Sequence, residues 1–208
     1  MKNLKVYVVG GSLKYSSFIK GCEVVNDIKS AQVVIFTGGE DVSPSMYGCR
    51  KHNRTSCNIE RDKKEKKIFD SIRQDQLVIG VCRGSQLLCV LNGGILVQDV
   101  PGHATGRTHE ITNGEMAYQI TSTHHQMQYP YVLDEKDYSV LYWSTLGAGY
   151  YEGDKIDGNV IAHKGEPEIV LYKKKGKPTC LAIQGHPEMM VDAPVVDMLN
   201  KLIEEYVH

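Results

Sequence analysis

The stretch that decides the fold is Leu77-Val78-Ile79-Gly80-Val81-Cys82-Arg83-Gly84, which continues as Ser85-Gln86-Leu87-Leu88-Cys89-Val90-Leu91. Residues 77–81 form an apolar run typical of a buried strand, and residues 85–91 are typical of an apolar helix. Between them lies the Gly-x-nucleophile-x-Gly pattern of a nucleophile elbow, with cysteine as the reactive residue. The glycines let the chain turn sharply and let neighbouring backbone approach closely. The pattern predicts a strand, a tight turn and a helix, with Cys82 at the start of the helix.

This position of Cys82 has a chemical consequence. A group at the N-terminus of a helix lies at the positive end of the helix macrodipole, which stabilises a negative charge. A cysteine placed there is favoured as the thiolate, which is its nucleophilic form. The sequence therefore predicts an enzyme that attacks an acyl carbon with Cys82.

The first half of the chain alternates short β-branched runs with helical segments. Strands are expected at Leu4–Val9 and Ala31–Thr37, and an amphipathic helix at 61–73 leads into the strand before Cys82. Such alternation predicts an α/β fold with a doubly wound, mostly parallel sheet. Ligands of these sheets bind beyond the carboxyl ends of the strands, so Gly38-Gly39 and Cys82 are expected to face each other.

The second half has a different pattern. A turn and short strand at 93–100 precede Tyr- and Val-rich runs at 138–142, 159–162 and 168–172, with a turn at Asp157-Gly158-Asn159. These runs predict antiparallel hairpins added to the sheet. A strand at 180–183 and an amphipathic helix at 194–206 follow, and the absence of a linker predicts a single domain over residues 1–208.

Composition limits the classes of partner. The 208 residues suffice for one substantial core, and 24 Lys and Arg nearly balance 25 Asp and Glu. This balance predicts no nucleic-acid partner. The basic clusters at 61–67 and 173–177 are best interpreted as the solvated face of a helix and a polar turn.

The chain also lacks the pattern of an exported or membrane protein. No segment approaches the roughly 20 apolar residues of a membrane span, and the apolar run at 6–9 is too short for a signal peptide. We therefore expect a cytoplasmic protein without a membrane partner. In that compartment, the six cysteines are expected to be reduced thiols.

A nucleophilic cysteine needs a base, and His186 has the best context among the eight histidines. In an extended segment, His186 and Glu188 would point to the same side, and Pro187 restricts the backbone between them. A carboxylate beside the imidazole selects one tautomer and stabilises the imidazolium. By itself the segment is equally compatible with a plain turn at the end of a strand. The elbow upstream favours the functional interpretation.

Taken together, these blocks resemble the class I (triad) glutamine amidotransferase superfamily. The resemblance is strongest to hydrolases of the γ-glutamyl-γ-aminobutyrate type. The matching segments, in family order, are Thr37–Pro44 with Tyr47-Gly48, Arg61-Asp62 with Glu65, the elbow 80–88, Gly93-Gly94 through Gln98-Asp99, Ser122–Gln126 and Gly185–Glu188. The resemblance implies a three-layer, flavodoxin-like fold. The chain departs from the family pattern at Gly185, where these hydrolases usually have an aromatic residue, and in its shorter 10–31 region.

The resemblance also implies a mechanism and a set of site residues. Cys82 would attack a γ-glutamyl amide and form a γ-glutamyl thioester, with His186 as acid and base and Glu188 orienting it. The oxyanion would be bound by backbone N–H groups of Arg83 and of the Gly38-Gly39 turn. The substrate's glutamyl group would be held by Gln86, His124 and His125. No cofactor is implied.

A metal site is not expected from the sequence. Adjacent side chains such as His124 and His125 diverge in an extended stretch, and no third ligand is apparent near them. The spacing of Cys49, His52 and Cys57 matches no zinc pattern.

Two other functions are compared with this one. The chain could be a glutaminase subunit that supplies ammonia from glutamine to a synthetase partner. A binding protein without turnover is disfavoured, because Cys82, His186 and Glu188 are all present.

Overall fold

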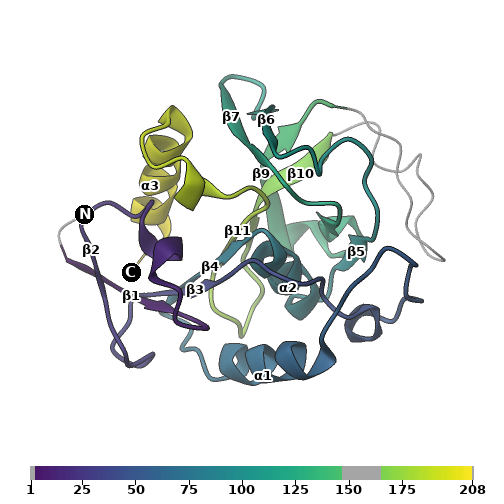
Figure 1. The fold of residues 1–208 in the computed structure, drawn as a ribbon. Coiled ribbons are helices and arrows are strands. Elements are labelled where there is room, and N and C mark those ends of the chain that lie inside the picture. Colours follow the sequence, from purple (N-terminus) through teal and green to yellow (C-terminus); the bar gives the residue numbers. More distant parts are fainter. Residues whose placement is uncertain (1–2, 147–164, 208) are drawn as a thin grey trace.

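One mixed sheet of nine strands forms the centre of the part of the chain that the computed structural model describes, residues 3–146 and 165–207. Its strands are β1 (Leu4–Val8), β2 (Cys22–Val24), β3 (Val33–Phe36), β4 (Leu77–Val81), β6 (Arg107–Thr112), β7 (Ala117–Ser122), β9 (Tyr138–Ser144), β10 (Glu166–Tyr172) and β11 (Cys180–Ile183). They are arranged in the order β2-β1-β3-β4-β11-β10-β9-β6-β7 (Figure 1). A separate antiparallel pair joins β5 (Ile95–Val97) to β8 (Met127–Tyr129).

The sheet has a parallel half and an antiparallel half. Strands β2, β1, β3, β4 and β11 pair in parallel, whereas the pairings from β11 through β10, β9 and β6 to β7 are antiparallel. The predicted α/β fold with hairpin additions is therefore confirmed. The hairpins lengthen the main sheet itself, so it is evenly mixed and not mostly parallel. The expected run at 159–162 and the turn at 157–159 lie outside the described residues.

Helices are few among the described residues, and they lie on both faces of the sheet. They are α1 (Ile59–Asp70), α2 (Arg83–Leu91) and α3 (Pro194–Tyr206). Figure 1 shows α1 and α2 on one side of the parallel strands and α3 on the other. Between β1 and β3 the short 10–31 region holds β2 and a single turn of 3₁₀ helix, η1 (Leu13–Ser16), instead of an α-helix. No helix in the described part of the chain is long and apolar enough to cross a membrane.

Alternating side chains of the central strands fill two cores, one on each face of the sheet. In β3, Val34 and Phe36 pack with α1 and α2, whereas Val33 and Ile35 pack with α3. This follows from the two-residue period of a strand, and both sets are buried because layers cover both faces. Each such side chain contributes roughly 1.5–3 kcal/mol to the free energy of folding.

The register of the central strands determines where the functional residues gather. Phe36 in β3 lies beside Gly80 in β4, and Val81 in β4 lies beside Ile183 in β11. Because these strands are parallel, the residues that follow each of them emerge at the same edge of the sheet. This edge brings together the segments that begin at Thr37, Cys82 and Gln184.

Candidate active site

Cys82 lies on a strained turn between β4 and α2. Its φ of 52° and ψ of −111° are rare for a residue with a side chain and cost on the order of 1–3 kcal/mol. Tertiary contacts hold this conformation: the Cys82 N–H donates to the Ile183 carbonyl at 2.8 Å, and the Cys82 carbonyl accepts from the N–H groups of Ser85 and Gln86. The predicted nucleophile elbow is thus present, with Cys82 at the N-terminus of α2.

The two glycines of the elbow are required by close backbone contacts. A Cβ at Gly84 would lie 2.1 Å from the carbonyl oxygen of Phe36, and a Cβ at Gly80 would lie 2.5 Å from the carbonyl oxygen of Gly84. Neither position has room for a methyl group. Glycine at position 84 therefore lets the elbow pack against β3, and glycine at position 80 lets α2 begin close to β4.

His186 and Glu188 form a buried pair at the end of β11. The Glu188 Oε1 lies 2.7 Å from His186 Nδ1, and the two residues are 5% and 7% exposed, respectively. The backbone N–H of His186 donates to the Thr121 hydroxyl at 2.6 Å, which fixes this segment to β7. Pro187 opens a turn of 3₁₀ helix, η5 (Pro187–Met189), that carries Glu188 under the imidazole.

Electrostatics favour the protonated form of His186. Burial lowers the pKa of His186, but the hydrogen bonds and charges of Cys82 and Glu188 outweigh burial and raise the pKa to about 10. The thiol of Cys82 is within hydrogen-bonding reach of the imidazole, and Cys82 is 8% exposed. A protonated imidazole at this position can stabilise negative charge on a neighbouring nucleophile.

The Gly38-Gly39 turn lies against this pair, as the sequence predicts. A Cβ at Gly38 would be 3.1 Å from Cε1 of His186 and 3.7 Å from Cβ of Cys82. The carbonyl of Gly38 accepts a hydrogen bond from Nη2 of Arg61 at 2.9 Å, so α1 fixes the turn from behind. Gly39 has a φ of 137°, and a Cβ there would lie 2.2 Å from Nη1 of Arg61.

Arg83 anchors the elbow to α1 through its side chain. The guanidinium is 1% exposed and forms ion pairs with Asp62 and Glu65, both of which are also buried. Its backbone N–H, the expected oxyanion donor, is at the first position of α2. The side chain of Arg83 therefore positions the backbone of the elbow.

Tyr15, on η1, is part of this site and was not predicted. Its hydroxyl oxygen would lie 2.8 Å from a Cβ at Gly38, and its ring centroid is 6.4 Å from that of His186. Burial and the charges of Glu188 and Cys82 raise the pKa of Tyr15, and a hydrogen bond with the Gly38 backbone opposes this rise. A lone tyrosine in a short polar segment gives no sequence signal for this placement.

The three expected substrate-binding residues lie in different surroundings. Gln86 is buried, and its Nε2 donates to the carbonyl of Gln126 at 2.9 Å. His125 is partly exposed, and its Nε2 lies 3.1 Å from Oδ1 of Asp41, whose hydrogen bond raises the pKa of His125. The neighbouring His124 is 3% exposed, and its Nδ1 donates to the same Gln126 carbonyl at 3.0 Å. The two adjacent imidazoles diverge, as expected for an extended stretch.

His124 belongs to a buried cluster that the sequence did not reveal. His103, His109, His124 and Glu168 each offer one ligand atom, and all four atoms lie within 4.8 Å of one another. The sequence showed no further ligand near His124, but the folded chain places three candidate ligands beside it. The ligands come from the loop before β6, from β6, from the loop after β7 and from β10, so no short spacing pattern could have indicated them.

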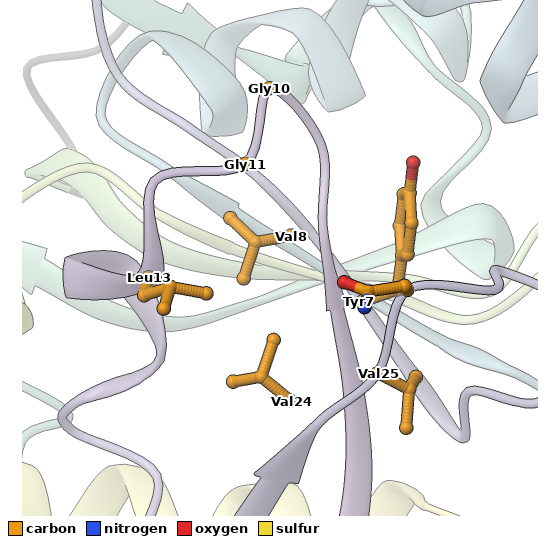
Figure 2. Close-up of a pocket in the computed structure, with 8 residues that line it drawn as sticks. Tyr7, Val8, Gly10, Gly11, Leu13, Val24 and Val25 are labelled. Atoms are coloured by element: carbon orange, nitrogen blue, oxygen red, sulfur yellow. The ribbon is translucent and has the colours of Figure 1, made fainter.

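A pocket at the edge of the parallel half of the sheet is not lined by charged residues or by residues of the site around Cys82. Figure 2 shows it between β1 and β2, with Val8, Leu13, Val24 and Val25 around it and the Gly10-Gly11 turn above.

Comparisons with known proteins relate the chain to the resemblance noted from its motifs. The sequence profile of the family described as Peptidase C26 matches residues 20–137, which include Cys82 but not His186. The glutamine amidotransferase-like protein YvdE of Lactococcus lactis is 28% identical over 174 residues, which cover 79% of this chain and 69% of that protein.

Solved structures share the fold. A GMP synthase component from Thermoplasma acidophilum superposes with a TM-score of 0.59 at 14% identity, covering 100% of this chain and 94% of that one. A glutamine amidotransferase from Methylobacillus flagellatus superposes with a TM-score of 0.53 at 14% identity, covering 99% and 76%. At such identities the likeness concerns the fold alone, and that fold is the one of class I glutamine amidotransferases.

Proposed function

The chain belongs to the Peptidase C26 family, and from this premise we propose that it hydrolyses the γ-glutamyl amide bond of a small γ-glutamyl compound. The observation that carries the proposal is the arrangement of Cys82, His186 and Glu188 at the carboxyl edge of the sheet. His186 is held protonated beside the cysteine, with a buried carboxylate 2.7 Å from its other ring nitrogen. These are the components that acyl transfer through a cysteine requires.

The first half of the proposed reaction forms a thioester. The Cys82 thiolate attacks the amide carbonyl carbon, and a C–S bond forms. His186 then transfers its proton to the nitrogen of the departing amine as the C–N bond breaks. Glu188 keeps the imidazole oriented and stabilises its charge throughout.

The second half releases glutamate. His186, now neutral, takes a proton from water, and the resulting hydroxide attacks the thioester carbon. The C–S bond breaks, glutamate leaves, and the thiolate–imidazolium pair is restored.

The negative charge that develops on the carbonyl oxygen needs donors. We assign this role to the backbone N–H of Arg83 and to the N–H groups of the Gly38-Gly39 turn, because the turn lies against Cys82 and His186. One donor of this kind typically contributes about 3–4 kcal/mol to transition-state stabilisation. The rigid support of both segments by α1, through Arg61 and Arg83, favours such a preorganised site.

Gln86 and His125 are proposed to line the glutamyl subsite. Gln86 donates to the carbonyl of Gln126 in the 122–126 loop, and His125 belongs to this loop and is partly exposed near Asp41. The ring nitrogens of His124 contact the Gln126 carbonyl and the buried cluster, so we assign the His124 side chain the role of positioning this loop.

An alternative is a glutaminase subunit that passes ammonia from glutamine to a synthetase partner. It uses the same first steps, with ammonia as the leaving group. Its support is the fold that the chain shares with the Thermoplasma acidophilum protein described above.

Glutamate release tests the proposal. The substrates are glutamine, γ-glutamyl-γ-aminobutyrate and other γ-glutamyl amides, and the variants are Cys82→Ala and the matched thiol control Cys22→Ala. Faster turnover of a substituted amide than of glutamine, lost in Cys82→Ala and kept in Cys22→Ala, supports the proposal. Turnover of glutamine alone supports the alternative. Equal turnover by Cys82→Ala and the wild type would contradict both.

A further inference from the structure

We propose that His103, His109, His124 and Glu168 bind one divalent metal ion, of the zinc class, in a closed structural site beneath the 122–126 loop. This inference does not depend on the proposed function. The site has a ligand set of its own, and none of its four residues takes part in the proposed bond-making steps.

The separations between ligand atoms fit a tetrahedral ion. Zinc binds imidazole nitrogen and carboxylate oxygen at about 2.0–2.1 Å, so the edges of its coordination tetrahedron are about 3.4 Å long. The distance from Nδ1 of His103 to Nε2 of His124 is 3.2 Å. The Oε1 of Glu168 lies 3.7 Å from Nδ1 of His103, 3.0 Å from Nε2 of His109 and 3.5 Å from Nε2 of His124. Four of the six edges are thus close to the length that zinc requires.

In His103 and His124, one ring nitrogen faces the cluster and the other makes a hydrogen bond outside it. The outer hydrogen bond determines that the nitrogen facing the cluster carries the lone pair. Nδ1 of His124 faces the Gln126 carbonyl, which can only accept, so this nitrogen carries the proton. Nε2 of His103 contacts the Glu166 carboxylate and likewise donates to it. In the neutral rings, Nδ1 of His103 and Nε2 of His124 therefore point bare lone pairs at each other.

These outer partners are those that metal-bound histidines have. A ligating imidazole usually donates its second N–H to a carboxylate or a backbone carbonyl, which fixes the tautomer and increases the basicity of the ligating nitrogen. His103 has a carboxylate in this role and His124 has a carbonyl. Facing lone pairs are repulsive without a positive charge between them, and a cation bound by both removes the repulsion.

The charge balance within the cluster also favours a bound cation. The side chains of Glu166 and Glu168 are 0% exposed. Among the described residues, neither carboxylate oxygen of Glu168 has a partner with hydrogen-bond geometry, although His109 approaches within 3.0 Å. Burying two carboxylates is costly unless they are paired or coordinate a metal. One divalent cation would balance both charges and occupy the unpartnered oxygen of Glu168.

The donor set selects the class of metal. Three imidazoles and one carboxylate suit zinc and its neighbours among the late first-row divalent ions. Magnesium and calcium require about six or more oxygen ligands, which this cluster lacks. Four protein ligands buried away from solvent define a closed, structural site, whereas a catalytic zinc keeps one position open for water or substrate.

Metal content of the full-length protein tests the proposal. The protein is produced with zinc in the medium, analysed for bound metal, stripped with a chelator and titrated with Zn²⁺ and Co²⁺. We expect one equivalent of zinc per chain and, with Co²⁺, the intense visible absorption of a tetrahedral site. Because the ion binds the folded state, zinc at 100-fold above its dissociation constant should raise the Tm of the stripped protein by about 5–10 °C.

Variants locate the site. Glu168→Gln and His109→Gln should bind zinc at least about 10-fold more weakly, since each removes a ligand or its charge. His125→Gln is the matched control, because His125 neighbours His124 in sequence but lies outside the cluster, and it should keep one equivalent. If the ligand variants do not fold, the zinc content of the wild type and the shift of its Tm on zinc binding test the proposal. A wild-type protein that neither retains zinc nor gains Tm from it would overturn the proposal. Unchanged zinc affinity in folded ligand variants would do the same.

Discussion

Replacing Gly185 with alanine should lower both stability and turnover, because a strand of the antiparallel half fills the space that a side chain would need. A Cβ at Gly185 would lie 2.5 Å from Cγ1 and 2.7 Å from Cδ1 of Ile120, and 2.9 Å from the carbonyl oxygen of Thr121. Ile120 is fully buried and cannot move aside without disturbing the core. The added methyl must therefore push β7 away from the end of β11.

The magnitude follows from this overlap. Overpacking a close-packed core by one methyl typically costs about 1–3 kcal/mol of unfolding free energy. For a chain of this size each kcal/mol corresponds to about 2–4 °C, so the Tm should fall by about 2–12 °C. The Thr121 hydroxyl also accepts the hydrogen bond from the His186 backbone at 2.6 Å. Displacing it by about 1 Å would misplace the imidazole and lower turnover on the order of 100-fold.

A double-mutant cycle with Ile120→Ala isolates the clash. The single Ile120→Ala variant should lose about 2–5 kcal/mol by leaving a cavity. Its truncated side chain no longer meets the Cβ at position 185, whereas the contact with the Thr121 carbonyl oxygen at 2.9 Å remains. The double variant should therefore be more stable than the sum of the single effects by part of the clash energy of about 1–3 kcal/mol. Thermal and urea unfolding measure all four proteins. Strict additivity, or an unchanged Tm for Gly185→Ala, would refute the reasoning.

Three further predictions concern the candidate active site. Cys82→Gly should unfold at a higher temperature than Cys82→Ala, because glycine relieves the positive φ of 52°, and both should lose turnover; equal Tm values would contradict the backbone strain. Arg83→Met should cost about 3–5 kcal/mol in urea unfolding, since it leaves the buried carboxylate of Asp62 without its cation and leaves Glu65 paired only with Arg61; a neutral effect would contradict this ion-pair network. Glu188→Gln should lower turnover roughly 10⁴-fold. The interactions that raise the pKa of His186 also stabilise the folded state. This stabilisation is complete at pH values below 6.5, the ordinary pKa of histidine, and it is lost as the pH rises through about 10. The stability advantage of the wild type over Glu188→Gln should therefore be larger at pH 6 than at pH 10, and a gap that does not narrow would contradict the assignment.

The sequence was sufficient wherever the structure depends on local signals. Strands at 77–81 and 180–183 and the helix at 194–206 have the predicted bounds, because strong apolar patterns mark them. The elbow was predictable for the same reason, since its two glycines lie in one short motif. The placement of Gly38 beside Cys82 followed from the rule that parallel strands end at one edge.

Features that depend on distant contacts were not predictable. The strands β6 (RTHEIT) and β7 (AYQITS) consist mainly of polar residues, so they lack the strong apolar pattern that would have indicated them. Their attachment to the main sheet, which makes it evenly mixed, is a matter of strand order and not of local pattern. Tyr15 and the metal-binding cluster are likewise defined only after folding, because their partners come from separate segments of the chain.

The β6–β7 pair connects the two sites physically. His109, a proposed metal ligand in β6, lies directly opposite Ile120 in β7, and Ile120 packs where a side chain of residue 185 would be. The next residue, Thr121, holds the backbone of His186. A metal ion that fixes β6 therefore also fixes the wall against which His186 rests. Because Ile120 occupies the space beside residue 185, the volume next to His186 is filled from β7 and not from the segment that carries the imidazole.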